Sequence, residues 1–405
     1  MHLDYTDEQR ALRDELRTYF AELLTPELRE ELGPSPGEHC GPVYRRVVRQ
    51  IGNDGWLGIG WPTKYGGQGR GPVEQFIFFS EARRANAPIP VVTLNTVGPT
   101  IMAFGSEDQK REFLPRIVRG EIHFAIGYSE PGAGTDLASL RTRAVRDGDG
   151  YLINGQKVFT TGGHDADYIW LAARTDPGAS KHDGITIFIV DTSLPGFKCT
   201  PIETLDGGRT NATYYEDLRV PASAVVGREN QGWRLITAQL NHERVALAPP
   251  GRVEALLDDV LDWARETTGP GGRPIDDPGV RLALARVKAK VDALRLLNWR
   301  LAWELSSEEL NPADASAVKV YGTELFVEAY RLLLEVVGQA GTLRAGSPGA
   351  VLAGRLERVY QSALVLTFGG GVNEVQREII ATTGLGLPRV PREAPPAAPA
   401  EGSGR

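Results

Sequence analysis

Residues 124–175 read FAIGYSEPGAGTDLASLRTRAVRDGDGYLINGQKVFTTGGHDADYIWLAART. The run YIWLAA is rich in β-branched and aromatic residues, and turn sequences such as DGDG interrupt the stretch, a combination that favours strands. The runs ITIFIV and ATYYEDLRV follow, separated by the turn-forming sequence LPG. We therefore predict a compact β domain over residues 123–232.

The chain before this region has a helical pattern. Thr6 and Gln9 have the spacing of a capping box, in which each side chain satisfies the backbone N–H of the other residue. Ser106 and Gln109 repeat this arrangement ahead of a second amphipathic run. Residues 1–122 are accordingly predicted to form an N-terminal helical domain.

The helical period returns after the β region, over residues 233–388. Asn311 is predicted to cap a helix that has Pro312 at its first position, where proline is well tolerated. Residues 389–405 are rich in Pro, Ala, Gly and Ser, so a disordered tail is expected there. The fold class that follows is α+β, mainly helical.

Composition excludes several classes of function. The chain has 405 residues and a formal net charge of −7, and no run of Lys or Arg forms a basic stripe, so nucleic acid is not an expected partner. Cys40 and Cys199 are the two cysteines, too few for a disulfide framework or a Cys-based metal site, and no metal is expected. Because there is no leader pattern and no apolar run that could span a bilayer, a cytoplasmic protein without membrane contact is predicted.

The stretch 124–175 resembles the signature of the acyl-CoA dehydrogenase family, with YSEPGAGTD followed by INGQK at the family's spacing. This resemblance implies an N-terminal helical domain, a central β-barrel or sandwich, and a C-terminal four-helix bundle. It also implies FAD as the cofactor and an acyl-CoA thioester as the substrate.

The resemblance assigns cofactor contacts to this chain residue by residue. Backbone N–H groups would bond the polar edge of the flavin, small glycines would allow close approach of the main chain, and hydroxyls would lie near the cofactor. Phe159 occupies the position of an aromatic ring that is usually Trp in the family. The expected cofactor-binding residues are Ile126, Tyr128, Ser129, Gly134, Thr135, Phe159, Thr161, Gly370, Gly371 and Glu374.

The catalytic base is not where many family members have it. The C-terminal loop TFGGGVNEVQRE, residues 367–378, has Gly370 in place of the glutamate. A subset resembling isovaleryl-CoA dehydrogenase has the glutamate on a helix instead, and Glu243 in NHERVALA matches that position. Ile236, Leu240 and Glu243 fall on one helical stripe, where a carboxylate would have a raised pKa suited to a general base. The alternative is a structural ion pair of Glu243, with Arg244 or with an arginine of another chain.

Further residues are assigned to the substrate. Asn241 and Arg244 match family positions that meet the acyl-CoA, and the Gly370 N–H is expected to donate to the thioester oxygen. Glu374 is expected at a helix start, in a role of cofactor loop or helix cap.

In homotetrameric members, each subunit contributes two sequence elements to a neighbouring subunit. This chain lacks both elements. There is no Arg-x-x-Phe after the first C-domain helix, and Val337 and Ala340 replace a Gln and a Gly. The pattern resembles the base-carrying subunit of bacterial α2β2 enzymes that shorten steroid side chains. It implies a second, related subunit as partner and an electron-transfer flavoprotein or similar acceptor.

Pro249 and Pro250 depart from the family pattern one turn after Glu243. Proline breaks or bends a helix, so the pair would either widen the acyl cavity for a bulky substrate or simply end the helix. The predicted reaction is dehydrogenation of an acyl-CoA to the 2,3-enoyl-CoA, within a β-oxidation pathway. The alternatives are a flavin oxidase or monooxygenase on the same fold and a catalytically silent assembly subunit.

Overall fold

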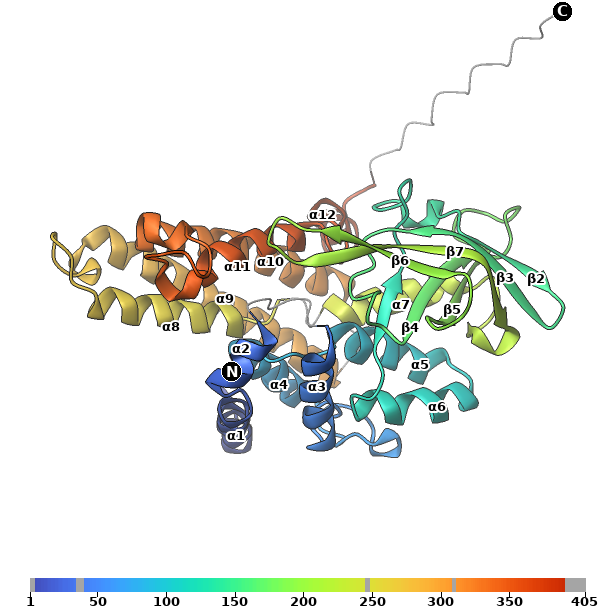
Figure 1. The fold of residues 1–405 in the computed structure, drawn as a ribbon, viewed down its shortest axis with the longest axis horizontal. Helices are drawn as coiled ribbons and strands as arrows, with labels where there is room; N and C mark the ends of the chain where they lie inside the picture. The colour runs from blue at the N-terminus through green and yellow to red at the C-terminus, as the bar shows by residue number, and fades with distance from the viewer. Residues whose placement is uncertain (1–3, 34–39, 245–247, 308–310, 390–405) are drawn as a thin grey trace, which may run out of the picture.

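The computed structural model of the protein describes residues 4–33, 40–244, 248–307 and 311–389, with the backbone alone for residues 240–244 and 307. Three groups of elements follow one another along the chain, and Figure 1 shows the sheet at one end of the molecule and the long C-terminal helices at the other. The N-terminal helices lie along one side of both.

The N-terminal group is helical, and both predicted capping boxes are confirmed. In α1 the Thr6 side chain accepts from the Gln9 N–H while the Gln9 side chain accepts from the Thr6 N–H, and Ser106 and Gln109 do the same at α6. The helices of this group are α1 (Asp7–Leu23), α2 (Pro26–Leu32), α3 (Pro42–Asn53), α4 (Pro72–Arg84), the π-helical turn η2 (Val92–Val97), α5 (Gly98–Phe104) and α6 (Glu107–Val118).

The strands form one mixed sheet in the described part of the chain, with the order β6-β7-β3-β2-β4-β5-β8 and with β1 added in parallel to β4. Gly155 shows why one signature glycine is required, since a Cβ there would approach the Thr142 Oγ1 to 2.5 Å at a shift in the β3–β7 register. The strands are β1 (Phe124–Gly127), β2 (Arg143–Asp147), β3 (Gly150–Lys157), β4 (Tyr168–Arg174), β5 (Ile185–Asp191), β6 (Phe197–Glu203), β7 (Arg209–Pro221) and β8 (Val225–Val226).

The C-terminal group is again helical, and the expected cap at Asn311 is confirmed, because its side chain accepts from the Ala313 N–H and Pro312 begins the helix. Helix α10 is central, since it packs against α7, α8, α9, α11 and α12. The helices are α7 (Gly232–Arg244), α8 (Gly251–Glu266), α9 (Pro278–Ser307), α10 (Pro312–Val337), α11 (Arg355–Leu364) and α12 (Asn373–Ile379).

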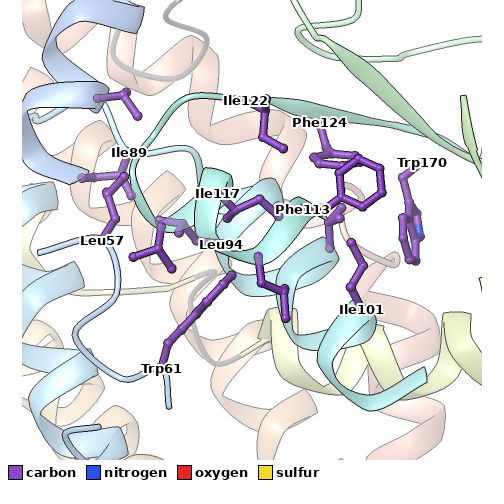
Figure 2. Packing of buried hydrophobic residues seen from close by; sticks show 14 of the residues in the cluster. Leu57, Trp61, Ile89, Leu94, Ile101, Phe113, Ile117, Ile122, Phe124 and Trp170 are labelled. Carbon is purple, nitrogen blue, oxygen red and sulfur yellow. The ribbon is translucent and has the colours of Figure 1, made fainter. Parts of the chain in front are cut away.

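The N-terminal helices and one face of the sheet share a hydrophobic core. Figure 2 shows Phe113 of α6 beside Phe124 of β1, with their ring centroids 5.8 Å apart, and Trp170 of β4 nearby. A second core lies inside the C-terminal helices, and a third lies on the other face of the sheet. Strand β1 is thereby held against η2, α6 and β4, and the signature loop begins directly after it.

The prolines after Glu243 separate two helices. Helix α7 is described up to Arg244, and α8 begins at Gly251 with Pro250 as its N-cap residue. Ala248 between them is fully buried, and its carbonyl accepts from the Asn298 side chain at 3.0 Å. The pair therefore marks the boundary between α7 and α8.

Candidate active site

The signature loop after β1 is tied directly to helix α7. The Tyr128 hydroxyl donates to the Gln239 Oε1 at 2.6 Å, and the Trp170 indole N–H lies 3.0 Å from the same oxygen. Gln239 is 1% exposed, and its Nε2 is buried without an acceptor among the described residues. A buried donor left without a partner is typical of a position that a ligand or water completes.

The position of Glu243 follows from this contact. Its backbone belongs to α7, one turn beyond Gln239, and residues four apart lie on the same face of a helix. That face meets the signature loop at Gln239. The side chains of Glu243, Asn241 and Arg244 lie outside what the structure describes, so their assigned roles stay predictions.

A buried ion pair supports the backbone of the signature loop. The Lys157 ammonium donates to the Glu130 Oε1 at 2.8 Å and to the Tyr128 carbonyl at 3.0 Å. The Glu130 carboxylate also accepts from the backbone N–H groups of Arg141 and Thr142. Burial lowers the pKa of Lys157 to about 8; for Glu130, burial opposes ionisation, but Lys157 and the backbone donors bring its pKa below the usual value. These four hydrogen bonds therefore fix the loop.

The tip of the same loop is exposed and leaves space for a ligand. Gly132 and Gly134 have nothing within 4 Å of a Cβ position, and Thr135 is exposed. The Ser129 carbonyl accepts from the Val158 N–H at 2.9 Å, whereas the Ser129 N–H donates to none of the residues in the described ranges. Ile126 precedes the loop, within β1, where it pairs with Trp170. A free N–H next to open glycines fits the polar edge of a flavin.

Phe159 has a strained backbone and an exposed ring. Its φ is +58°, in the left-handed region that non-glycine residues seldom adopt, and its side chain is 66% exposed. Hydrogen bonds of Val158 to Ser129 and of Thr160 to Asn211 hold the backbone on both sides. Strained backbone and exposed aromatic rings both occur preferentially at binding surfaces. Phe159 is thus suited to cover a planar ligand.

Thr161 lies two residues further on and is exposed. Its hydroxyl is 3.1 Å from that of Thr210, so it is oriented by the neighbouring strand β7.

The glycine loop precedes α12. Gly370 and Gly371 have φ of +65° and +95°, which glycine adopts without penalty, and neither N–H donates to a residue that the structure describes. Glu374 lies exposed in the first turn of α12, so the predicted helix start is confirmed. Its side chain does not cap the helix start at Val372, and its contact with the cofactor stays a prediction.

A recess of about 320 Å³ opens beside the signature loop. Its volume is at the lower end of small-molecule sites, so it can accept part of a ligand but not a whole dinucleotide. Ser139, Arg141 and Gln156 provide polar groups; the remaining lining residues are Glu130, Pro131, Gly132, Thr142 and Gly155.

Four residues that the sequence did not single out contact the candidate site residues or their loops: Gln239, Lys157, Lys319 and Asn373. Lys157 was visible within INGQK, but as part of a motif and not as a buried cation. Asn373 likewise lies within the quoted stretch 367–378, but nothing there marks it as a buried partner of a lysine. Gln239 and Lys319 lie in ordinary helical sequence, where no local signal distinguishes them.

Comparison with known proteins identifies the class. Three domain families match the chain: acyl-CoA dehydrogenase, N-terminal domain, over residues 6–121; middle domain, over 125–218; and C-terminal domain, over 230–385. The chain belongs to the acyl-CoA dehydrogenase family, and its fold is the one that this family has. Its members are FAD-dependent oxidoreductases, which agrees with the open donors and the exposed aromatic ring described above.

Individual relatives cover almost the entire chain. Acyl-CoA dehydrogenase FadE26 of Mycobacterium tuberculosis is 57% identical over 97% of this chain and 100% of its own length. A chain of the ChsE4-ChsE5 complex from Mycobacterium tuberculosis superimposes with a TM-score of 0.90 at 57% identity, covering 96% of this chain and 100% of that one. The Tcur3481-Tcur3483 steroid ACAD gives a TM-score of 0.90 at 53% identity over 96% and 100% of the two chains.

The helices of the described ranges differ from membrane-spanning helices. None of them combines the length and the apolar character that crossing it would require.

Proposed function

We propose that this chain is the base-carrying subunit of an FAD-dependent acyl-CoA dehydrogenase that converts a bulky acyl-CoA to its 2,3-enoyl-CoA. The observation that carries this proposal is the Tyr128–Gln239 hydrogen bond, which joins the signature loop to α7 one turn before Glu243. This hydrogen bond joins the face of α7 that carries the candidate base to the loop that forms the candidate cofactor site.

Glu243 would remove the proton from the carbon α to the thioester carbonyl. As that C–H bond breaks, negative charge develops on the carbonyl oxygen, and the N–H groups of Gly370 and Gly371 would donate to it. The chemistry that FAD would supply when bound is acceptance of the β hydrogen as hydride, and the electron pair of the broken α C–H bond would then form the new double bond. The proton would remain on Glu243, and Asn241 and Arg244 would hold the substrate.

The cofactor would be held by the loop donors and by the residues assigned above. Ser129 would bond the polar edge of the ring system, and Phe159 would cover its face, with Thr161 near the reacting edge. Gln239 would supply the additional buried donor that the sequence did not predict.

A bulky substrate is supported by two observations. The chain is more than half identical to a protein described as a steroid ACAD. In addition, Pro249 and Pro250 lie where α7 and α8 are separated, beyond Glu243, and we propose that this break accommodates a bulky acyl chain. We propose a steroid side-chain acyl-CoA and a place in a β-oxidation pathway of steroid degradation.

A second, related subunit in an α2β2 assembly is supported by exposed apolar residues. Leu282, Leu296 and Trp303 are 53%, 47% and 65% exposed on α9 and are spaced by multiples of seven residues, so they share one helix face. One structural relative is described as the ChsE4-ChsE5 complex, and another carries the double designation Tcur3481-Tcur3483. We further propose that an electron-transfer flavoprotein or a similar carrier accepts the electrons.

The deciding experiment is Glu243→Gln in the complex assembled with its partner subunit, with FAD content measured by absorbance. Turnover with an artificial electron acceptor should fall by a factor of about 10²–10⁴ while FAD content is unchanged, because only the proton acceptor is lost. Glu378→Gln on the exposed side of α12 is the matched control and should keep full activity. Unchanged turnover in Glu243→Gln would favour a silent assembly subunit.

Two further assays test the electron acceptor and the substrate. Rapid oxygen consumption without an added acceptor would indicate an oxidase or monooxygenase. Faster turnover of straight-chain acyl-CoAs than of steroidal ones would contradict the proposed substrate.

A further inference from the structure

A buried lysine holds both ends of the glycine loop. Lys319 of α10 is fully buried, and its ammonium donates to the Asn373 Oδ1 at 2.7 Å and to the Thr367 carbonyl at 3.3 Å. Thr367 and Asn373 flank the segment that contains Gly370 and Gly371. One side chain therefore sets the distance across the base of the loop.

The contact belongs to a polar network between α10 and α12. The Asn373 amide donates to the Thr323 hydroxyl at 3.2 Å and to the Glu324 carboxylate at 3.1 Å. The Ser316 hydroxyl donates to the Gln376 Oε1 at 2.9 Å. Ser316, Lys319 and Thr323 are separated by three and four residues, so they form one stripe on α10.

This stripe is buried although it is polar. Ser316 and Lys319 are 0% exposed, Thr323 is 1% exposed, and Asn373 and Gln376 on the other side are 3% and 1% exposed. Burying polar and charged groups between two helices adds less stability than packing apolar side chains there. Directional hydrogen bonds, however, fix the relative position of two backbones more narrowly than apolar contacts do.

The loop is also supported from the side of α12. A Cβ on Gly371 would come within 2.6 Å of the Gln376 Nε2, so the loop backbone lies directly on this side chain. Ser316 in turn holds Gln376. The backbone at Gly371 is consequently fixed by α10 through two separate contacts, one through Lys319 and one through Ser316.

We propose that Lys319 is a positioning residue for the dehydrogenation, which holds the Gly370 and Gly371 N–H groups where the thioester oxygen becomes negative. The inference rests on the proposed function, since it requires that these donors polarise the thioester. Because the proposed base is on α7 and not in this loop, the loop contributes only backbone donors, and its effect depends on where its backbone is held.

The test uses Lys319→Met and Asn373→Ala in the assembled, FAD-loaded complex, with Arg331→Met on α10 as the matched control. Lys319→Met removes both hydrogen bonds across the loop, whereas Asn373→Ala removes one and keeps the lysine, in case the first variant does not fold. Arg331→Met also removes a cation from α10, but Arg331 is exposed, lies further along the helix and bonds Glu335 of the same helix, so it does not support the loop.

Three readouts are measured: the steady-state constants, the charge-transfer absorbance on titration with a 3-thiaacyl-CoA, and the hydrogen exchange of peptides covering 367–376. The α proton of a 3-thiaacyl-CoA is acidic enough to be lost without oxidation. In both loop variants kcat should fall about tenfold or more with KM little changed, because donors act mainly in the transition state. The charge-transfer band should weaken, since the enolate of the analogue loses the same donors. Exchange should rise about tenfold for the bonded amides of Phe368, Gly369 and Gln376, which corresponds to a loss of one ordinary hydrogen bond.

Full kcat and an unchanged charge-transfer band in both variants would overturn the proposal, as would equal changes in Arg331→Met. The exchange measurement does not depend on turnover. If the wild-type complex oxidised no acyl-CoA, the proposed function would fail, while faster exchange in the variants would still show that Lys319 fastens the loop.

Discussion

At the scale of single residues, His123 shows how burial controls a titration. It is 7% exposed, and both ring nitrogens are buried without a hydrogen-bond partner among the described residues. Burial is the main cause that lowers its pKa to about 4, with Arg45 acting in the same direction and Asp165 and Asp167 opposing it. The ring is therefore neutral in the folded protein at neutral pH.

This pKa predicts an acid-dependent loss of stability. Between pH 4 and pH 6.5 the unfolded chain binds more protons than the folded one, so the free energy of unfolding falls as pH falls through this window. His123 should account for a loss of about 2 kcal/mol on going from about pH 7.5 to about pH 5. Denaturant unfolding at the two pH values should show a smaller decrease for His123→Phe, which keeps the ring volume and does not titrate. Equal decreases in the two proteins would contradict the assignment.

At the scale of elements, the contact between α4 and α8 depends on one glycine. A Cβ on Gly251 would lie 2.0 Å from the Ser80 carbonyl oxygen and 3.0 Å from the Arg84 backbone nitrogen. Neither backbone atom can move without displacing a helix. The absence of a side chain at the start of α8 is therefore what allows this helix to cross the last turn of α4.

Gly251→Ala is expected to lower the free energy of unfolding by about 1–3 kcal/mol, as overpacking of a close contact does. Gly271→Ala serves as the control, because nothing lies within 4 Å of its Cβ position, and its stability should change little. Urea unfolding of the two variants measures the difference. A Gly251→Ala protein as stable as the control would mean that α8 can shift away from α4 at little cost.

At the scale of the whole molecule, the exposed face of α9 has the character of an interface. Leu296 lies in the middle of the stripe formed with Leu282 and Trp303, and the same helix buries its opposite face in the C-terminal core. Large apolar side chains gathered on one helix face are unusual on a surface that only meets water.

Leu296→Glu should therefore weaken assembly with the partner subunit about tenfold or more, because a carboxylate would be buried without a partner at the contact. Leu205→Glu is the matched control, since Leu205 is 70% exposed in the turn between β6 and β7, away from α9. Analytical ultracentrifugation of co-expressed subunits distinguishes the two. If both variants assembled as the wild type does, the α9 face would not be the interface.

Much of the fold was accessible from the sequence because its signals are local. The capping boxes at Thr6 and Ser106, the cap at Asn311 and the strand-rich texture of residues 123–232 each depend on residues a few positions apart. The signature loop and the candidate base position on α7 were accessible for a different reason, namely that they resemble a known family. The contact role of Glu374 and the side-chain contacts of Glu243 stay predictions.

What the tertiary structure alone decided is which polar groups are buried together. Tyr128 meets Gln239, Lys157 meets Glu130, and Lys319 meets Asn373, and in each pair the partners come from different elements. A lysine within an amphipathic helix pattern is expected to face water, and only the arrival of α12 on α10 places Lys319 inside. Periodicity and caps are set by neighbours along the chain, whereas burial is set by whichever element packs against a residue. For that reason the sequence determined the elements, the family and the candidate base, and the packing determined how the loops of the site are held.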